Sequence, residues 1–275
     1  MAITNFIPTI WSETLYRELD KQYIAVSNCA RDFEGDIKSC GSVVKICGVG
    51  EITVSEYTKN TDMSTPQDLS DTVKELTIDR ARYFNFQIDD IDKAQSTPKL
   101  LEQAMSTAAS GLSDEADSYV FSLYEDAGKS VKIDGATAEN ILDAIISARQ
   151  KLYESNVSDS SNIVIEVSPA VASLILKAKL LVATDNASTL EAGCLGLIGG
   201  CKVFVSNNIK TVSEGEYTYH KCLVRTKRAI AFAEQLSEIE AFRPEKRFAD
   251  AVKGLHLYGA KVIYPNEMVL LDTGI

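Results

Sequence analysis

The most glycine-dense stretch of the chain, residues 193–200, could hold a phosphate. Its glycines are Gly193, Gly196, Gly199 and Gly200. In a dinucleotide-binding loop the glycines follow a strand and open a helix, whose N-terminus faces the phosphate. Here they precede a β-branched run, residues 202–205. The order therefore predicts a turn rather than a phosphate site.

Two acidic clusters could coordinate a divalent cation. They are Asp89, Asp90 and Asp92 in the first, and Asp114, Glu115 and Asp117 in the second. The first stands at the end of a predicted strand and lacks partner carboxylates at a readable spacing. The second lies on a predicted helix, where acidic residues commonly occupy the solvent face. We expect both clusters to be solvated, so no metal or other cofactor is predicted.

No serine or cysteine stands in a recognisable nucleophile motif. The sequence has no Gly-x-Ser-x-Gly elbow, and the separation of Ser173 and Lys177 misses the Ser-x-x-Lys spacing. Two histidines, His220 and His256, could serve as a general base, but both have apolar neighbours. We expect both to be structural. A cytosolic α/β enzyme stays open as an alternative and would need a pocket with convergent polar groups.

The cysteines show neither a metal-binding nor a disulfide pattern. No pair has Cys-x-x-Cys spacing, and no signal peptide precedes them, so a cytoplasmic chain with reduced, buried thiols is expected. The six are Cys29, Cys40, Cys47, Cys194, Cys201 and Cys222.

Composition narrows the class of protein further. The chain has 275 residues, a net charge of −11 and 45% hydrophobic residues, which is typical of a folded globular protein. No window gathers the Lys and Arg cluster that tracks phosphates, so tight nucleic-acid binding is not expected. No apolar run reaches the roughly 18 residues that span a bilayer.

Hydrophobic periodicity predicts an arm, a hairpin and a long helix in the first half. Residues 9–28 fit an amphipathic helix after an extended arm. The β-branched runs 42–46 and 52–57, separated by glycines, predict a hairpin, and residues 58–72 a polar tip. Residues 74–89 then predict one long projecting strand. Residues 97–127 give the clearest helix, in which Gly111 predicts a close approach by another segment.

The second half alternates helices and strands before it becomes mainly β. Helices are expected over 137–153 and from Pro169 to Lys179, the second capped by Ser168. The expected buried side of the first includes Ile146. Strands are expected over 163–167, 203–205, 217–226, 229–233, 259–264 and 268–271. This order predicts a mixed α+β protein whose late strands return to an earlier sheet.

Several motifs resemble those of tailed-bacteriophage major capsid proteins. The start, Ala2–Pro8 followed by Trp11-Ser12, is similar to the start of many of them. So is Gly48–Val54, and the longest and most specific match is Tyr83–Gln95. Asp114–Asp117 and the glycine-rich turn extend the resemblance over essentially the whole chain.

The resemblance implies the Hong Kong 97 phage capsid fold. This α+β fold has an N-terminal arm, an extended β-hairpin loop, a long spine helix, a peripheral domain and an axial domain. The implied boundaries are residues 1–40 for the arm and first helix, and 41–88 for the hairpin loop. The peripheral domain with the spine helix takes residues 89–131 and 226–275, and the axial domain takes 132–225.

The function that the resemblance implies is structural, with no catalytic residue. It is a subunit of an icosahedral capsid that self-assembles into capsomers and a shell. The shell encloses double-stranded DNA without tight specific binding, and assembles in the host cytoplasm to form the virion. Because the chain starts at the arm, scaffolding is expected either from a separate protein or from a segment that this chain has lost. A portal is a further expected partner, and no membrane is. A cellular nanocompartment shell protein shares the fold and is the structural alternative.

The same resemblance implies that the arm and the loop tip contact neighbouring subunits. The expected contact residues are Phe6, Ile7, Trp11, Thr58, Lys59, Asn60, Thr61 and Asp62.

Overall fold

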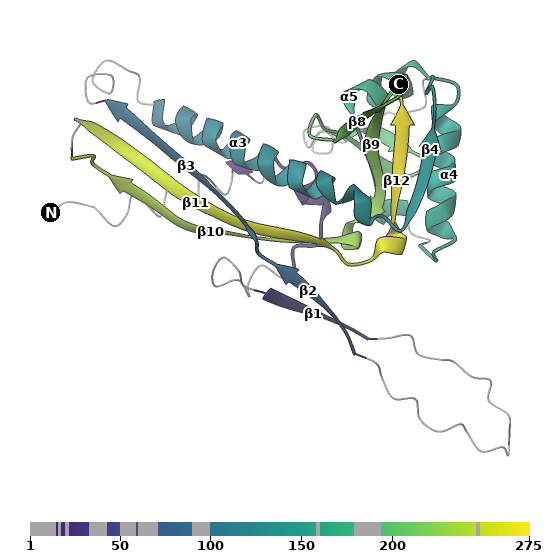
Figure 1. Ribbon diagram of the computed structural model, residues 1–275, viewed down its shortest axis with the longest axis horizontal. Helices are drawn as coiled ribbons and strands as arrows, with labels where there is room; N and C mark the ends of the chain where they lie inside the picture. Colours follow the sequence, from purple (N-terminus) through teal and green to yellow (C-terminus); the bar gives the residue numbers. More distant parts are fainter. Residues whose placement is uncertain are drawn as a thin grey trace.

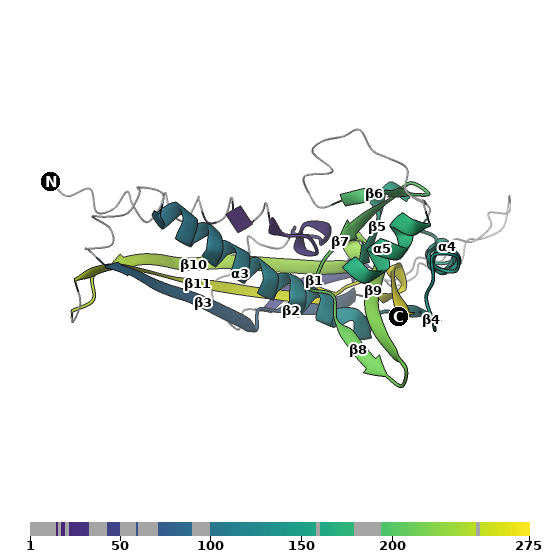
Figure 2. The ribbon, with the colours of Figure 1, turned by 90° about the horizontal axis from the view of Figure 1, so that it is seen from above.

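The chain forms an elongated molecule with a lobe at one end (Figure 1). The computed structural model describes residues 15, 18–19, 22–32, 43–49, 59, 71–89, 100–157, 160–178, 194–245 and 248–275. A three-stranded sheet and helix α3 (Leu100–Ser122) make the elongated part (Figure 2). A seven-stranded sheet with two helices makes the lobe. The α+β class expected from the sequence is confirmed.

Helix α3 packs one apolar face against the three-stranded sheet. Its buried apolar positions recur every three or four residues, as the helical period requires. They are Met105, Ala109, Leu112, Ala116 and Val120. The chain then tightens into a 3-10 turn, η3 (Leu123–Asp126). The described part of the predicted helix is confirmed, but no described segment approaches Gly111 as expected, because a Cβ there would meet none of them within 4 Å.

The three-stranded sheet is antiparallel, in the order β10-β11-β3. Its strands are β3 (Arg80–Asp89), β10 (Ile230–Phe242) and β11 (Ala249–Val262). The predicted strands 229–233 and 259–264 are therefore parts of much longer ones. A register shift between Leu236 and Glu238 interrupts the alternation of β10. This irregularity hides the length of the strand in the sequence.

The single strand predicted over 74–89 is wrong, because it is two strands in different sheets. β2 (Asp71–Thr77) pairs with β1 (Val43–Val49), whereas β3 pairs with β11. Between them the chain crosses β11 at Ile78, which is fully buried. Gly259 permits this crossing, since a Cβ there would lie 2.3 Å from the carbonyl oxygen of Thr77.

The pair β1–β2 covers part of the outer face of the three-stranded sheet, opposite α3. Its buried side chains join a small apolar cluster with residues of β10 and β11. Val49 stands opposite Asp71, so the two strands flank residues 50–70 as the arms of an antiparallel pair. Residues 42–46 were predicted to pair with 52–57, but β1 pairs with β2 instead. Residues 52–57 lie outside the described part of the chain.

The lobe is built on a mixed sheet in the order β4-β12-β9-β5-β7-β6, with β8 paired to β9. Its strands are β4 (Lys129–Ile133), β5 (Ile163–Val167), β6 (Cys194–Ile198), β7 (Cys201–Val205), β8 (Thr211–Glu214), β9 (Tyr217–Thr226) and β12 (Met268–Gly274). The predicted strands 163–167 and 217–226 coincide with β5 and β9. β12 is parallel to β4 and antiparallel to β9, so a late strand does return to an earlier sheet.

The two lobe helices, α4 (Ile141–Tyr153) and α5 (Pro169–Lys177), pack on this sheet. Helix α5 begins as predicted, with Ser168 accepting a hydrogen bond from the backbone N–H of Val171. Helix α4 begins later than residue 137, after a turn in which Asn140 donates to the carbonyl oxygen of Gly135. Ile146 was expected to be buried but is 49% exposed, so that prediction is wrong.

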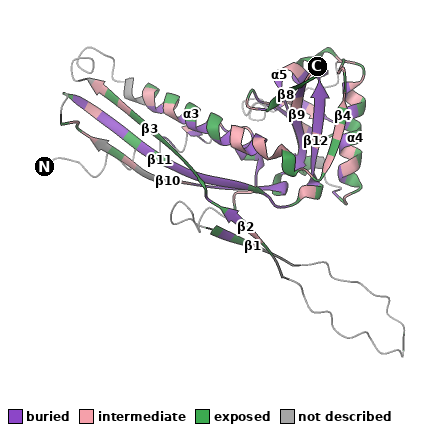
Figure 3. Cartoon of the chain, viewed as in Figure 1, coloured by how far each residue is buried: buried purple, intermediate pink, exposed green. Residues whose placement is uncertain are grey.

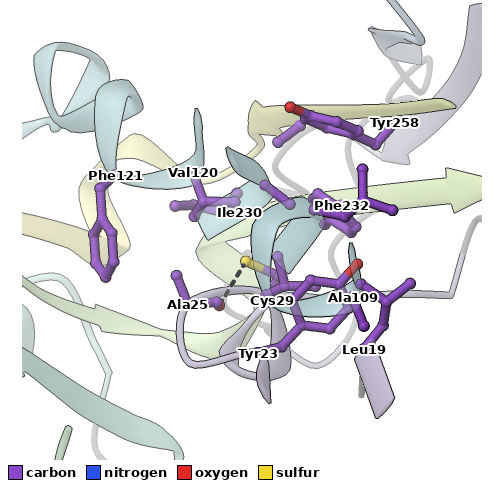
Figure 4. Packing of buried hydrophobic residues seen from close by; sticks show 14 of the residues in the cluster. Leu19, Tyr23, Ala25, Cys29, Ala109, Val120, Phe121, Ile230, Phe232 and Tyr258 are labelled. Carbon is purple, nitrogen blue, oxygen red and sulfur yellow. Dashed lines mark hydrogen bonds between the residues drawn. The ribbon is translucent and has the colours of Figure 1, made fainter. Parts of the chain in front are cut away.

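Two apolar cores result, one for each half of the molecule (Figure 3). The first lies between α3, the three-stranded sheet and residues 22–32, which we call the N-terminal segment and which include the 3-10 turn η1 (Val26–Asn28). Figure 4 shows Tyr23 and Cys29 of this segment packed among Phe232 and Tyr258. The second core fills the lobe beneath α4 and α5.

Glycine substitutions test the crossing of β2 into β3. Gly259→Ala should destabilise the chain by about 1–3 kcal/mol, because the new methyl group meets the Thr77 backbone. Gly111→Ala is the matched control and should stabilise by roughly 1 kcal/mol, since it removes an exposed helical glycine. Urea unfolding followed by circular dichroism would measure both changes. Equal effects of the two substitutions would contradict the proposed crossing.

Candidate functional site

The residues predicted to contact neighbouring subunits fall almost wholly outside the described part of the chain. Phe6, Ile7, Trp11, Thr58, Asn60, Thr61 and Asp62 lie outside the described residues. Lys59 alone of this set is described, in an exposed turn. These contacts therefore stay predictions.

The outer face of the three-stranded sheet is only partly covered. Along β3 the side chains alternate: Phe84 and Phe86 pack against the core under α3, whereas Tyr83 is 78% exposed. Leu255, opposite Tyr83 on β11, is also exposed. The two side chains form a small exposed apolar area beside the β1–β2 pair.

A shallow hollow of about 250 Å³ opens beside this pair. It is lined by Tyr83, Phe84, Asn85, Glu240, Lys253, Gly254 and Leu255. Its two charged side chains, Glu240 and Lys253, pair with each other at 2.7 Å and are about half exposed. Such an ion pair is an ordinary surface pair, and it leaves no charged group directed at a substrate.

The junction between the lobe and the elongated part holds a fully buried ion pair. Arg225 of β9 donates from Nε and Nη2 to the two carboxylate oxygens of Glu166 on β5, at 2.9 and 2.8 Å. The same guanidinium donates to the carbonyl oxygens of Asn28 and Ala25, at 2.6 and 3.1 Å. Although burial favours the neutral form, Glu166 raises the pKa of Arg225 above its usual value. This guanidinium therefore joins two lobe strands to the N-terminal segment.

Asp117 of α3 holds the same segment from the other side. Its carboxylate accepts backbone hydrogen bonds from Ile24, Ala25 and Val26, at 2.9 to 3.0 Å. Burial raises the pKa of Asp117 to about 7, and the backbone donors oppose that effect. The expectation that Asp117 would lie on a solvent face is wrong, because it is 2% exposed. Asp117 thus accepts from the otherwise unpaired backbone N–H groups at the start of η1.

The other acidic residues considered in the sequence do lie at the surface. Asp114 accepts from the side chain of Asn208 at 3.0 Å, and Glu115 pairs with Arg82 at 3.0 Å. Asp89 ends β3, whereas Asp90 and Asp92 lie outside the described residues. Within the described ranges no group of three His, Cys, Asp or Glu side chains is placed to hold a metal ion.

A second buried carboxylate, Glu234 of β10, also holds the N-terminal segment. It accepts a hydrogen bond from the hydroxyl of Tyr23 and pairs with Arg31, both at 2.5 Å. Nε2 of His256 lies 2.9 Å from the same carboxylate. Burial alone would raise the pKa of Glu234, but His256, Tyr23 and Arg31 lower it. His256 is thus part of a packed structural network, as expected.

The glycine-rich stretch and the cysteines have structural positions. Gly199 and Gly200 form the turn between β6 and β7 with positive φ, as a two-residue hairpin requires. Cys29, Cys194, Cys201 and Cys222 are free and buried. Burial raises the pKa of Cys29 to about 11 and that of Cys222 to about 12, so neither is a reactive thiolate.

The buried pair was not recognised in the sequence, although each partner carries a signal. Glu166 is the only charged residue in the run Ile163–Val167, and Arg225 lies in the mainly apolar end of β9. Opposite charges in two otherwise buried strands indicate a pair, because a single buried charge is costly. No comparable signal marked Asp117 as buried, because its sequence neighbours Asp114 and Glu115 are acidic residues that lie in solvent.

No protein-family model and no curated protein matches the sequence, whereas solved structures match along nearly the whole chain. A chain from Mycobacterium phage Che8 is 27% identical, with a TM-score of 0.69 and 91% of each chain covered. A chain from the capsid of Ralstonia phage GP4 is 11% identical, with a TM-score of 0.69 and 93% and 90% covered. A chain of a virus-like particle from Pyrococcus furiosus is 12% identical, with a TM-score of 0.57 and 97% and 99% covered.

These comparisons confirm the resemblance to tailed-phage major capsid proteins that the sequence motifs indicate. Chains from the capsids of the cyanophage P-SCSP1u and of Ralstonia phage GP4 share its fold. Among the described helices none is long and apolar enough to cross a membrane.

Removing Arg225 from its buried pair should cost far more stability than removing Lys132 from an exposed pair. Arg225→Met should destabilise the chain by about 3–5 kcal/mol, because it leaves the carboxylate of Glu166 buried without its partner. Lys132→Met, which removes an exposed pair with Glu214, should cost less than about 1 kcal/mol. Combining Arg225→Met with Glu166→Leu should recover much of the loss. Denaturant unfolding would check all three, and equal costs for Arg225 and Lys132 would contradict the assignment.

Proposed function

We propose that this chain is the major subunit of an icosahedral tailed-phage capsid, which self-assembles into capsomers and a shell around double-stranded DNA. The observation that carries the proposal is the structural match to a chain from Mycobacterium phage Che8 and to a chain from the Ralstonia phage GP4 capsid, each over about nine-tenths of both partners. The strands and helices of this chain thus occur in the same arrangement as in proteins that build shells. A net charge of −11 is compatible with a shell around DNA, because like charges repel and keep the DNA from binding to the inner surface.

The Hong Kong 97 elements can be assigned to the described parts of the chain. In this assignment α3 is the spine helix, and the three-stranded sheet belongs to the peripheral domain. The pair β1–β2 is the base of the extended loop, and the lobe is the axial domain. Because β12 lies inside the lobe sheet, this axial domain would include Met268–Gly274 besides residues 132–225.

Two exposed surfaces offer contacts between subunits. On the sheet, Tyr83 and Leu255 mark an uncovered region next to the β1–β2 base. On the lobe, α4 and α5 expose Ile146, Tyr153 and Leu176. A closed shell requires different patches on each subunit to meet, so one chain must carry several such surfaces. The predicted contacts of the arm and of Thr58–Asp62 would add area that a compact body lacks.

The proposal places the chain in the virion after assembly in the host cytoplasm, with a scaffolding protein and a portal as separate partners. A nanocompartment shell protein would have the same fold. The chain of the virus-like particle from Pyrococcus furiosus also matches this chain, with a TM-score of 0.57. The Che8 chain supports the phage proposal more strongly, because both its TM-score and its identity are higher.

The proposed function predicts particles much larger than one chain. Purified protein, alone or with its scaffolding protein, should form rings or shells that electron microscopy and sedimentation detect. The measurement should span protein concentration and salt, because shell contacts are individually weak. A strictly monomeric species under every condition, with scaffold supplied, would contradict the proposal.

Shortening the loop separates folding from assembly. Replacing residues 50–70 by Asn-Gly joins Val49 to Asp71, which already face each other, by a tight two-residue turn. Folding should be nearly unchanged by circular dichroism and thermal melting, because a shorter loop costs less closure entropy. Assembly should fail or give malformed particles, because the loop no longer reaches a neighbour.

A variant of unchanged length provides the control for that experiment. Residues 58–70 replaced by Gly and Ser keep the reach but remove the side chains. If this variant also fails to assemble, the tip side chains make the contact. If the Asn-Gly variant assembles normal shells, the loop is not part of the interface, and if it unfolds, the loop belongs to the core.

A further inference from the structure

Three short connections join the lobe to the elongated part in the described portion of the chain. They are the turn from η3 into β4, η5 (Lys227–Ala229) between β9 and β10, and η6 (Pro265–Glu267) between β11 and β12. In the lobe sheet β4, β12 and β9 are consecutive neighbours. All three connections therefore enter one half of that sheet, and the other half, formed by β5, β7 and β6, receives none of them.

The three connections are bonded to one another. The backbone N–H of Gly128 donates to the carbonyl oxygen of Pro265 at 2.9 Å. The hydroxyl of Thr226 donates to the carboxylate of Glu267 at 2.6 Å. A few residues at the ends of elements, gathered between two packed bodies, are where hinges form. Bonds within such a region resist rotation about it only weakly, because they lie close to its axis.

The N-terminal segment reaches the half of the lobe sheet that the connections leave out. Ile24 packs against the apolar cluster of Val164 on β5, Cys194 on β6 and Phe204 on β7. The segment, drawn in purple, lies beside β7 in Figure 2. It thus contacts the three lobe strands into which no connection runs.

Hydrogen bonds attach the same segment to both halves of the molecule. Toward the lobe, the carbonyl oxygens of Ala25 and Asn28 accept from the buried guanidinium of Arg225. Toward the elongated part, Asp117 of α3 accepts from the backbone N–H groups of residues 24–26. One short stretch of chain therefore bridges the two bodies through buried bonds on each side.

The end of the segment is anchored on the edge of β10. The N–H of Ala30 donates to the carbonyl oxygen of Ile230, and the carbonyl oxygen of Ala30 accepts from the N–H of Phe232, both at 2.9 Å. These are backbone bonds to the three-stranded sheet. Changes to lobe side chains therefore leave this end attached.

One other loop of the lobe touches α3. Its Ile209 joins the first core, and the neighbouring Asn208 donates to Asp114 at 3.0 Å. That hydrogen bond is exposed, so its net contribution is small. Met268 of the lobe also enters the first core, but it begins β12 and so lies at a connection. Among the described residues, the buried bonds of the N-terminal segment are thus the main directional restraint on the β5, β7 and β6 side.

We propose that the N-terminal segment is a strap that sets the orientation of the lobe. Docked, it holds β5, β7 and β6 against the elongated part. Released, it lets the lobe turn about the three connections, while each half stays folded on its own core. The inference concerns a single chain, so it stands whether or not the chain forms a shell.

Distance measurements on the full-length protein test the strap. Spin labels are placed at Ser110 of α3 and Ser147 of α4, both exposed, through a ketone-bearing amino acid that leaves the cysteines untouched. Labelled chains are mixed with excess unlabelled chains, so that pulsed electron paramagnetic resonance reports distances within one chain. The wild-type protein should give one narrow distance. Arg225→Met combined with Glu166→Leu should add a second distance, because it removes the bonds of the segment to the lobe.

Hydrogen exchange shows whether the segment is released in the same variant. Because two hydrogen bonds from a charged donor are lost, the opening equilibrium of residues 22–32 should rise about tenfold or more. Helix α4 serves as the internal reference. A segment that exchanges faster while the lobe keeps its single distance overturns the proposal. Unchanged exchange also overturns it, since these bonds would then not hold the segment.

A substitution outside the lobe separates the strap from the packing of the lobe itself. Asp117→Ala removes the acceptor of three backbone N–H groups of the segment and alters no lobe residue. It should bring in the same second distance. Retention of the single wild-type distance in Asp117→Ala overturns the proposal.

Lys221→Met combined with Asp272→Leu is the matched control. This ion pair is also buried and joins β9 to β12 at 2.9 Å, and among the described residues it has no bond to the N-terminal segment. The control variant should keep the single distance. A second distance here as well would assign the motion to the loss of any buried ion pair, and so overturns the proposal.

A milder variant keeps the test decisive if the substitutions at Arg225 or Asp117 prevent folding. Ile24→Ala shortens one partly buried side chain of the segment and leaves every hydrogen bond in place. It should speed exchange of residues 22–32 and add the second distance to a smaller extent. An unchanged distance in Ile24→Ala overturns the proposal.

Discussion

The structure depends on one constraint, that the charge of Arg225 is buried at the junction of the lobe with the elongated part. Removing a guanidinium from water costs several kcal/mol, and only good geometry offsets that cost. Glu166 supplies two of the acceptors, and the carbonyl oxygens of Ala25 and Asn28 supply the others. If any one element were displaced, a buried donor would be left without an acceptor. The pair thus fixes the two lobe strands against the N-terminal segment, which Asp117 in turn joins to helix α3.

Around this junction the two halves of the chain are stabilised separately. The elongated part has its own core under α3, and the lobe has another beneath α4 and α5. The contacts between the halves combine apolar side chains of the lobe that enter the first core, such as Leu223 and Met268, with hydrogen bonds, whose geometry is directional. This arrangement would suit the proposed shell subunit, whose two halves must keep a defined relative orientation while their outer surfaces meet other copies.

Much of the fold could be predicted from the sequence where local signals were strong. β5 is a continuous apolar run that ends at a Ser-Pro cap, and α3 keeps its helical period over its whole described length. The strand over 74–89 could not be divided from sequence alone, because Leu76, Ile78, Phe84 and Phe86 keep the same alternation across the break. The break depends on Gly259, which is distant in the sequence and leaves no local trace at Ile78.

The candidate site was less predictable for a related reason. Asp117 follows Asp114 and Glu115 closely in the sequence, so composition suggested a solvated face. Its burial depends on the N-terminal segment, which folds back over the helix from more than 90 positions earlier. Arg225 and Glu166 are likewise brought together by strand pairing. The predicted contacts of the arm and loop tip stay predictions, since nearly all of those residues lie outside the described part of the chain.

The position of β12 limits how far the lobe can fold during translation. β12 is synthesised after every other strand of the lobe sheet, yet it lies between β4 and β9. Until it emerges, β4 and β9 each present an unpaired edge, and the second core lacks Val269 and Leu271. The lobe therefore cannot complete its fold during translation of the preceding residues. A nascent chain therefore presents no finished lobe surface before β12 has been synthesised.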